Sequence, residues 1–348
     1  MSTGKITSKR LALVGGVVAL VLTTAACGGS ASENKTDSGG DTSGKHYKYF
    51  VLPKFIGIPV FEQTNIGSKE AANELGDTVT FNGPTTPSAQ EQVTFINNAA
   101  QQGVNAIITS ANDPNALAPS LKQASSQGIM SVTFDSDVAK DARSVFISGP
   151  KPDVIAKAML ESVGSQIDFK GDIAFMSTTP DATNQNSWIG ATKTLLKDPK
   201  YSGMKLVATV YGKEDDAVAT TVTRGLLQSN PNLRGLLAYT GGGAAAARVL
   251  QSEKKCGDVA LYALTLPSVM EPVMKTGCVK ESAIWSFKDL GYLGVYASRA
   301  LLDKKISGKV GESFDAGKLG KQTIEENNTV YLSKLQIINK ANAGSLGF

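Results

Sequence analysis

The chain has 348 residues, of which 41% are hydrophobic and 19% are charged, and its formal net charge is +4. This composition is typical of a globular protein, and the length is sufficient for two lobes of about 150 residues, each with its own core. Lys5, Lys9 and Arg10 lie in a segment that we expect to be removed, which leaves a net charge of +1. A nearly neutral chain without a basic block lacks the electrostatic features of a nucleic-acid-binding protein.

Residues 1–26 have the pattern of a bacterial lipoprotein signal peptide. Basic residues precede an apolar run from Leu11 to Leu22, which is too short to span a bilayer. Cys27 follows two alanines, an arrangement that resembles the lipidation site of bacterial lipoproteins, although Thr24 stands where leucine is usual. We therefore expect Cys27 to be lipidated; an ordinary secretory signal with an incidental cysteine is the alternative.

Residues 27–45 are rich in Gly, Ser, Asp and Thr, and we expect a flexible tether there. From Tyr47 onward, short apolar runs alternate with segments of helical periodicity. The expected strands are Tyr47–Leu52, Val79–Phe81, Ala106–Thr109, Ile129–Phe134, Val145–Ser148, Asp172–Met176, Lys205–Val210, Leu236–Tyr239, Val259–Leu264 and Ser282–Trp285. The expected helices are Val60–Leu75, Ser88–Ala100, Ala116–Ser126, Pro152–Ile167, Asn186–Leu196, Ala217–Leu227, Ala244–Gln251, Ser268–Lys275 and Leu290–Leu302.

Strands that alternate with helices in this way predict an α/β fold with parallel sheets. Two such series predict two Rossmann-like lobes with a cleft between them. We expect the first lobe to comprise residues 46–142 and a returning segment at about 287–316, and the second lobe to comprise residues 143–286. The tail, residues 317–348, contains one strand-like run at Leu335–Asn339 and has no predicted place in either lobe.

Loops at the carboxyl ends of parallel strands face the ligand in open α/β sheets. Asp135 directly follows one buried strand, near the point where the two lobes would meet. The other candidate ligand-binding residues are Lys54, Phe55, Phe61, Asn184, Gln185, Tyr239, Thr240, Gly241 and Trp285. Carboxylates accept hydrogen bonds from neighbouring hydroxyls, carboxamides both donate and accept, and aromatic faces suit the C–H side of a sugar ring. The set therefore favours a neutral polyol.

Each candidate also has a simpler interpretation. Asp135 would serve equally as a helix cap or in an Asx-turn, and Asn184 as a cap for the following helix. Lys54 would be an ordinary solvated lysine, and Trp285 an ordinary core residue. Gly241–Gly243 would be a loose turn; alanines follow these glycines, whereas a phosphate-binding loop has Lys-Ser or Lys-Thr there.

Cys256 and Cys278 remain as an even pair, and we expect a structural disulfide, with free buried thiols as the alternative. Neither cysteine is a candidate nucleophile, because a nucleophilic cysteine needs a nearby base. The only histidine, His46, lies at the end of the expected tether. No sequence motif for a metal site or a hydrolase elbow is present in the chain, and we expect no metal and no cofactor.

Five stretches of the chain resemble the ribose-type periplasmic binding proteins, and most closely the branch of rhamnose-binding and furanosyl-autoinducer-binding proteins. They are Val51–Lys54, Phe81–Pro87, Phe134–Asp137, Ala182–Trp188 and Asp289–Leu293. The resemblance covers Tyr47 to Asn339. It implies a type I periplasmic binding protein, in which two lobes joined by hinge strands close on one small molecule and deliver it to the permease of an ABC transporter.

Within this branch, Lys54, Asp135 and Gln185 match ligand-contacting positions of the autoinducer-binding members. Asn184 stands where those members have Asp, and Tyr239 and Gly241 stand where they have Pro and Ala. These departures favour rhamnose, or a related deoxyhexose or pentose, over the autoinducer. Ser286 also differs, because the resemblance leads us to expect Asp or Asn after the tryptophan.

The sequence thus predicts a monomeric, extracytoplasmic lipoprotein, anchored to the outer face of the cell membrane, that binds a small sugar and is not an enzyme. In this hypothesis Asp135, Asn184 and Gln185 hold hydroxyls, Lys54 donates to a ligand oxygen, and aromatic side chains flank the ring. An exported enzyme is disfavoured because the only histidine, His46, lies at the junction of the expected tether and the first lobe. A sensor that presents its ligand to a membrane receptor remains an alternative to transport.

Overall fold

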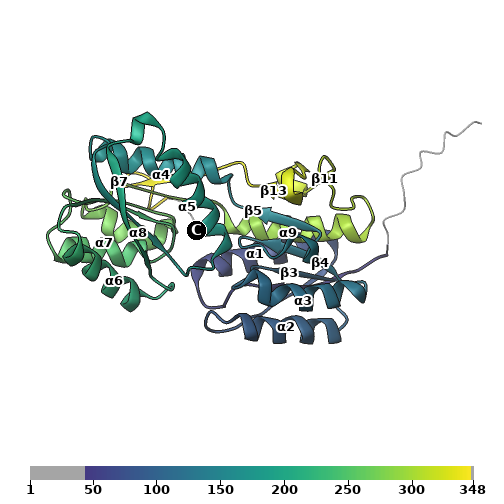
Figure 1. The fold of residues 1–348 in the computed structure, drawn as a ribbon. Coiled ribbons are helices and arrows are strands. Elements are labelled where there is room, and N and C mark those ends of the chain that lie inside the picture. Colours follow the sequence, from purple (N-terminus) through teal and green to yellow (C-terminus); the bar gives the residue numbers. More distant parts are fainter. Residues whose placement is uncertain (1–43, 346–348) are drawn as a thin grey trace, which may run out of the picture. The chain divides into compact units, whose positions relative to one another are not determined.

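A six-stranded parallel sheet forms the centre of the first lobe in the computed structural model, which describes residues 44–345 (Figure 1). The strand order is β13-β5-β4-β3-β1-β2. The bounds are β1 (Lys48–Leu52), β2 (Thr78–Phe81), β3 (Ala106–Thr109), β4 (Met130–Phe134), β5 (Val145–Ser148) and β13 (Thr329–Tyr331). A separate antiparallel pair is formed by β11 (Ser313–Asp315), which follows α9 (Phe287–Leu302), and β12 (Lys321–Thr323) in the tail.

Helices cover both faces of this sheet. On one face α2 (Ala89–Gln101) and α3 (Pro114–Ser126) pack together, and on the other α1 (Pro59–Leu75) packs along α9 (Phe287–Leu302). Because successive side chains of a strand point to opposite faces, Phe50 and Leu52 join the core under α2 and α3, whereas Tyr49 and Val51 join the other core. The helix that begins at Phe287 returns to the first lobe, as predicted.

The second lobe has its own parallel sheet, with strand order β7-β6-β8-β9. Its strands are β6 (Gly171–Ser177), β7 (Met204–Tyr211), β8 (Leu233–Ala238) and β9 (Ala260–Ala263). A single bridge between Leu264 and Ala283 attaches β10 (Glu281–Ile284), and β14 (Gln336–Asn339) pairs antiparallel with β10. The helices are α4 (Pro152–Gln166), α5 (Thr183–Leu195), α6 (Asp216–Ser229), α7 (Gly243–Ser252) and α8 (Pro267–Lys275).

The structure corrects the predicted boundary between the lobes. Val145–Ser148, placed in the second lobe from the sequence, is β5 and pairs in parallel with β4 of the first sheet. The apolar run indicates a strand but does not specify its sheet. The guanidinium of Arg143 fixes the β4–β5 connection, donating to both carboxylate oxygens of Asp137 at 2.6 and 3.0 Å. The boundary therefore follows Ser148.

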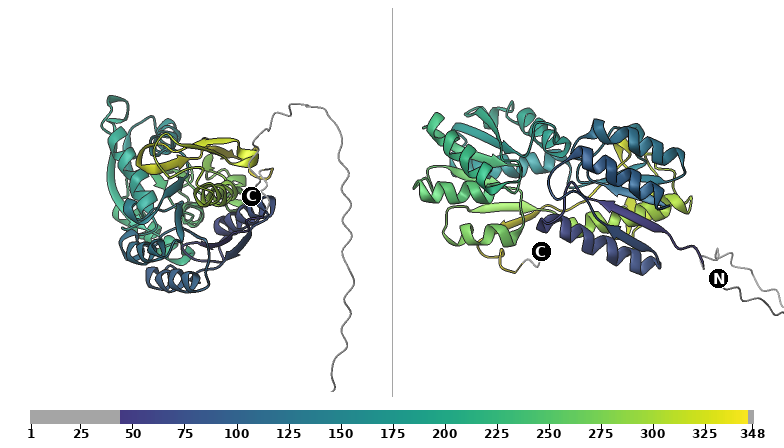
Figure 2. Two further views of the ribbon diagram at one scale, coloured as in Figure 1. Left: turned by 90° about the vertical axis from the view of Figure 1, so that its right-hand side faces the viewer. Right: turned by 90° about the horizontal axis from the view of Figure 1, so that it is seen from below.

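The tail, for which the sequence predicts no lobe, joins both lobes. Residues 329–331 pair as β13 with the outer edge of β5, and residues 336–339 pair as β14 with β10. The chain consequently crosses between the lobes three times: after β5, after β10 and after β13. Figure 2 shows these crossings between the two lobes. Short connecting segments of this kind can act as a hinge between two lobes.

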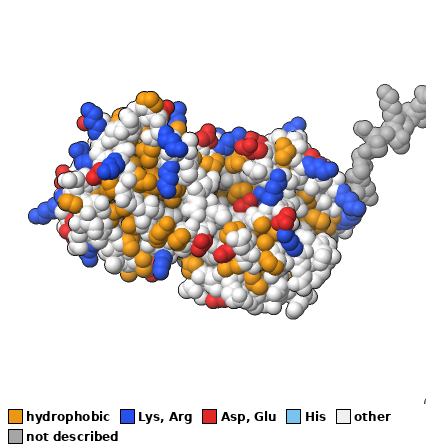
Figure 3. All heavy atoms as spheres, viewed as in Figure 1, with side chains coloured by type: hydrophobic (Ala, Val, Ile, Leu, Met, Phe, Trp, Pro, Cys, Tyr) orange, Lys and Arg blue, Asp and Glu red, His pale blue; other side chains and the backbone are white. Residues whose placement is uncertain are grey.

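The structure joins Cys256 and Cys278 in a disulfide between the segments that follow α7 and α8. Cys256 precedes β9 and Cys278 precedes β10, so both lie at the amino ends of these strands. On the face drawn in Figure 3, acidic and basic side chains are interspersed over both lobes. Among residues 44–345, no helix combines the length and apolar character needed to cross a membrane. Cys27, the signal segment and nearly all of the tether lie outside the described residues.

The packing of α1 on α9 depends on glycine, and this predicts a large effect for Gly67→Ala. A Cβ at Gly67 would lie 1.8 Å from the carbonyl oxygen of Lys288, so the helices would have to move apart. Overpacking of about 3 kcal/mol exceeds the gain of about 1 kcal/mol in helix propensity. We expect the free energy of unfolding, measured by urea denaturation, to fall by about 2 kcal/mol.

Gly190→Ala in α5 provides the matched control, because a Cβ at Gly190 would have no atom within 4 Å. There only the propensity gain remains, and we expect stabilisation by up to about 1 kcal/mol. Equal effects of the two substitutions would contradict the close helix contact.

Candidate functional site

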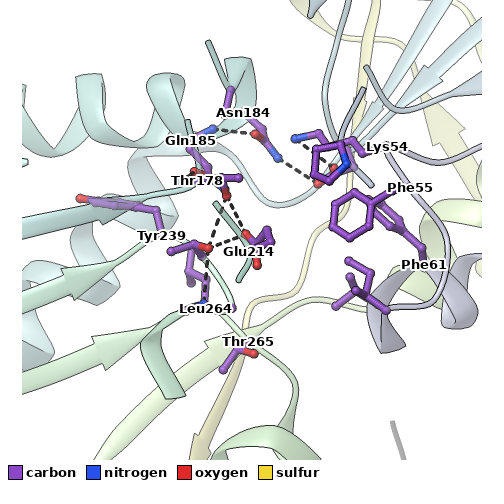
Figure 4. A pocket seen from close by; sticks show the side chains of 18 of the residues that line it. Lys54, Phe55, Phe61, Thr178, Asn184, Gln185, Glu214, Tyr239, Leu264 and Thr265 are labelled. Atoms are coloured by element: carbon purple, nitrogen blue, oxygen red, sulfur yellow. Dashed lines mark hydrogen bonds and ion pairs between the residues drawn. The ribbon is translucent and has the colours of Figure 1, made fainter. Parts of the chain in front are cut away.

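A cavity of about 410 Å³ lies between the two lobes, at the carboxyl ends of strands from both sheets. This volume is within the range of about 300–1,000 Å³ that is usual for small-molecule sites. All ten candidate ligand-binding residues from the sequence line it: Lys54, Phe55, Phe61, Asp135, Asn184, Gln185, Tyr239, Thr240, Gly241 and Trp285. Figure 4 shows the polar side chains of the second lobe opposite Lys54, Phe55 and Phe61 of the first lobe.

Asp135 projects into the cavity from the residue that follows β4. Its backbone is left-handed, with φ of 57°, a conformation that Asp tolerates better than most residues. One carboxylate oxygen accepts from the hydroxyl of Ser110 at 2.9 Å, and the other accepts from the amide of Asn184 at 3.0 Å. Asp135 caps no described helix, and it forms a hydrogen bond from the first lobe to the second.

Lys54 is the cationic partner of this carboxylate. Its ammonium lies 4.0 Å from Oδ2 of Asp135, and its side chain is 13% exposed, which excludes the interpretation as an ordinary solvated lysine. The carbonyl of Lys54 accepts from the amide of Asn112 at 2.7 Å, which fixes the loop after β1. The ammonium can therefore donate to an oxygen placed beside Asp135.

Asn184 and Gln185 lie in the first turn of α5, a helix that begins three residues earlier than predicted. The amide of Asn184 donates to Asp135, and its side-chain carbonyl accepts from the backbone N–H of Gln185 at 2.8 Å, so the side chain also satisfies a donor in the first turn of α5. The carbonyl of Gln185 accepts from Ser177 at 2.5 Å and from the backbone of Thr178 at 2.6 Å, and its amide donates to the Thr178 hydroxyl at 2.7 Å. Gln185 consequently fixes the loop after β6 and keeps only one N–H for another partner.

Tyr239 lines the cavity, but its hydroxyl is engaged elsewhere. Its hydroxyl donates to Thr192 at 2.6 Å within the second lobe, and Figure 4 shows the ring directed away from Phe55 and Phe61. Burial raises the pKa of this phenol. The ring packs edge-on against Phe175 in the core of the lobe, so the hydroxyl of Tyr239 does not face the cavity.

Glu214 is a cavity residue that the sequence analysis missed. It lies three residues after β7, and its Oε1 accepts from the hydroxyls of Thr178, at 2.6 Å, and Thr240. The rule that identified Asp135 also applies here, because the loop Gly212–Asp215 follows a predicted strand. The structure thus brings a second carboxylate into the cavity, from the opposite lobe.

Aromatic side chains form the apolar wall of the cavity. Phe55 meets Phe61 edge-on, with ring centroids 5.9 Å apart, and Phe61 meets Phe287 in the same way at 6.3 Å. Trp285, in the second crossing between the lobes, stacks on Phe287 at 5.8 Å and meets Trp188 edge-on at 5.2 Å. These contacts leave Trp285 only 2% exposed. Trp285 is therefore both a core residue and a lining residue, and the two sequence interpretations are compatible.

The cavity has a polar end, with carboxylates, an ammonium, carboxamides and hydroxyls, and an apolar end built from aromatic and aliphatic side chains. Such a site suits a small ring with hydroxyls on one edge and C–H groups on the other. Within residues 44–345, no group of three His, Cys, Asp or Glu side chains is arranged to hold a metal ion.

Comparisons with known proteins agree with this architecture. Residues 49–306 match the family model described as a periplasmic binding protein domain. A solved structure of a sugar ABC transporter protein from Actinomyces odontolyticus is 39% identical, with 87% of this chain and 98% of that chain covered and a TM-score of 0.73. An ABC transporter solute-binding protein from Clostridium phytofermentas, solved with bound L-rhamnose, is 31% identical over 86% of this chain and 97% of that chain, with a TM-score of 0.81.

The fold is also shared with more distant proteins. LsrB from Clostridium saccharobutylicum, solved in complex with AI-2, is 23% identical over 86% of this chain and all of its own, with a TM-score of 0.81. The two lobes with parallel sheets agree with the two-lobe architecture of type I periplasmic binding proteins. The chain belongs to the family of periplasmic binding proteins.

Proposed function

We propose that the protein is an extracytoplasmic solute-binding lipoprotein that captures a small sugar and delivers it to the permease of an ABC transporter. The ligand in this proposal is rhamnose, or a related deoxyhexose or pentose. The observation that carries the proposal is the division of the cavity into a polar end at Asp135 and an aromatic wall at Phe55 and Phe61. A deoxyhexose has the same division, with adjacent hydroxyls on one part of the ring and a methyl group on another.

Binding in this site follows from the hydrogen-bonding capacity of its polar end. Each oxygen of Asp135 already accepts one hydrogen bond and can accept another, which suits two neighbouring sugar hydroxyls. Lys54 donates to a ligand oxygen beside this carboxylate. Because closure of the lobes buries these groups, a ligand that lacks one hydroxyl leaves a buried polar atom unpaired and is rejected.

The relatives support a sugar as the ligand. The Actinomyces odontolyticus protein is described as a sugar ABC transporter protein, and the Clostridium phytofermentas protein holds L-rhamnose. The furanosyl autoinducer is the second candidate, because Lys54, Asp135 and Gln185 match the autoinducer-binding pattern and all three line the cavity. Asn184 weakens this candidate, because it replaces a carboxylate by an amide that donates to Asp135.

The proposed mechanism is binding and hinge closure, without a chemical step. His46, the only histidine in the chain, is not among the residues that line the cavity, so the lining has no imidazole to act as a general base. Lipidation of Cys27 belongs to the proposal and is tested by mass spectrometry of the N-terminal peptide. If the partner is a membrane receptor instead of a permease, the protein would act as a sensor that binds its ligand in the same cavity.

A thermal-shift screen of the detergent-purified full-length protein tests the proposal. The panel comprises L-rhamnose, other deoxyhexoses, pentoses, polyols, and the furanosyl autoinducer with and without borate. A ligand at 100 times its dissociation constant adds about 2.7 kcal/mol to the free energy of unfolding, so we expect a clear shift with one sugar. A shift with the autoinducer alone would select the second candidate, and no shift with any compound would refute the proposed function.

A further inference from the structure

The carboxylate of Glu214 is held in place by its own lobe but has a free oxygen. Its Oε1 accepts from the hydroxyls of Thr178 and Thr240, whereas no hydrogen bond to Oε2 exists within the described residues. Among residues 44–345, no basic nitrogen lies within 4.0 Å of the carboxylate oxygens of Glu214 to form an ion pair. Figure 4 shows Glu214 close to Thr178, with Phe55 and Phe61 of the first lobe on its other side.

The backbone around Glu214 supports a functional role. Lys213 and Glu214 both adopt left-handed conformations, with φ of 55° and 51°, which for such side chains cost of order 1 kcal/mol each. Gly241 makes room for the carboxylate, because a Cβ at Gly241 would lie 2.9 Å from Oε2 of Glu214. A strained loop, two hydroxyls and a glycine thus combine to present one acceptor oxygen to the cavity.

The charge of the lining limits what this oxygen can bind. The acidic residues that line the cavity are Asp135, Asp181, Glu214 and Asp216, against Lys54 as the only basic one. Lys54 lies beside Asp135 in the first lobe, whereas Glu214 belongs to the second lobe. A carboxylate accepts hydrogen bonds but cannot donate them, so Oε2 requires an O–H or N–H group and repels a carboxylate or phosphate.

We infer that Glu214 is a specificity-determining residue that accepts a hydrogen bond from a hydroxyl of the bound sugar that Asp135 does not contact. The inference rests on the proposed function and extends it. The ligand is held by one carboxylate from each lobe, so both lobes contribute to recognition. The ligand has hydroxyls for both carboxylates and is a neutral sugar, not a sugar acid or a sugar phosphate.

The test compares Glu214→Gln with wild type by calorimetric titration of the full-length protein. The probe is L-rhamnose, or the sugar that gives the largest thermal shift if L-rhamnose gives none. Glutamine keeps the shape and removes the charge, and a hydrogen bond to a charged group is worth a factor of about 10 to 100 in affinity. The matched control is Glu253→Gln in the same lobe, an exposed carboxylate near Arg224 outside the cavity, which we expect to change affinity less than twofold.

Monodeoxy analogues of the same sugar distinguish recognition from a structural effect. One analogue should bind wild type about as weakly as Glu214→Gln binds the parent sugar, and Glu214→Gln should not distinguish that analogue from the parent. If Glu214→Gln does not fold, Gly241→Ala is the second variant, because its Cβ displaces a carboxylate on a flexible side chain and is expected to weaken binding at least tenfold.

The outcomes separate the two proposals. Tight binding of a sugar by wild type together with unchanged affinity in Glu214→Gln, or in Gly241→Ala where that variant is used, overturns the role of Glu214 and leaves the proposed function intact. If the loss of affinity in Glu214→Gln adds to the loss caused by every deoxy analogue, the role of Glu214 is also overturned. Absence of binding by wild type to every sugar overturns both.

Discussion

Replacing Asp135 by Asn is expected to weaken sugar binding by about 30-fold to several thousand-fold, or about 2–5 kcal/mol. The amide has the size of the carboxylate and tolerates the left-handed backbone, with φ of 57°, so the fold should be retained. The NH₂ group of the introduced asparagine must, however, face either the hydroxyl of Ser110 or the amide of Asn184. Both of these groups donate to Asp135 in wild type, so a hydrogen bond is lost. Lys54 would also lose its partner.

Asp141→Asn is the control for this substitution. Asp141 belongs to the same lobe, but its side chain is 71% exposed and pairs with Lys122 on the surface. Exposed ion pairs contribute little, so sugar affinity and stability should both stay close to wild type. Titration calorimetry measures the sugar affinity of wild type, Asp135→Asn and Asp141→Asn. Sugar binding by Asp135→Asn within threefold of wild type would show that the ligand is held elsewhere.

Removing the disulfide, with Cys256→Ser and Cys278→Ser together, is expected to lower the free energy of unfolding by about 3 kcal/mol. The bond closes a loop with a sequence separation of 22 residues, and in the chain-entropy model a loop of this size contributes about that amount. Urea denaturation of the full-length protein measures the change. Neither cysteine lines the cavity, so the affinity for sugar should not change.

A reductant provides the control for this prediction. Dithiothreitol should destabilise wild type by the same amount and leave the double variant unaffected. Equal unfolding midpoints of wild type and the double variant under oxidising conditions would contradict a stabilising disulfide.

The alternation of strands and helices was sufficient to predict the α/β class and the two parallel sheets. These features depend on local periodicity and on the general rule that βαβ units form parallel sheets. The allocation of β5 and β13 was not predictable in this way. β13 has only three residues, and its pairing with β5 joins segments that are far apart in the sequence, so no local pattern specifies it.

The same limit applies to the site. The position of Asp135 follows from the rule that strand ends face ligands, and that rule also applies to Glu214. The direction of the Tyr239 side chain does not follow from it, because the residue after a strand can turn to either side of the sheet. The use of Gln185 to fix Thr178, likewise, depends on where α5 begins, and helix ends are poorly specified by sequence.

Tryptophan fluorescence tests binding in the interlobe cavity most directly. The chain has two tryptophans, Trp188 and Trp285, and both line the cavity, so the emission reports on the proposed site alone. Titration of wild type with L-rhamnose or a related sugar should give a saturable change in emission with one sugar per chain, and Asp135→Asn should give none at the same concentrations. No saturable change with any sugar, together with an unfolding temperature that no sugar raises, would contradict a sugar-binding cavity.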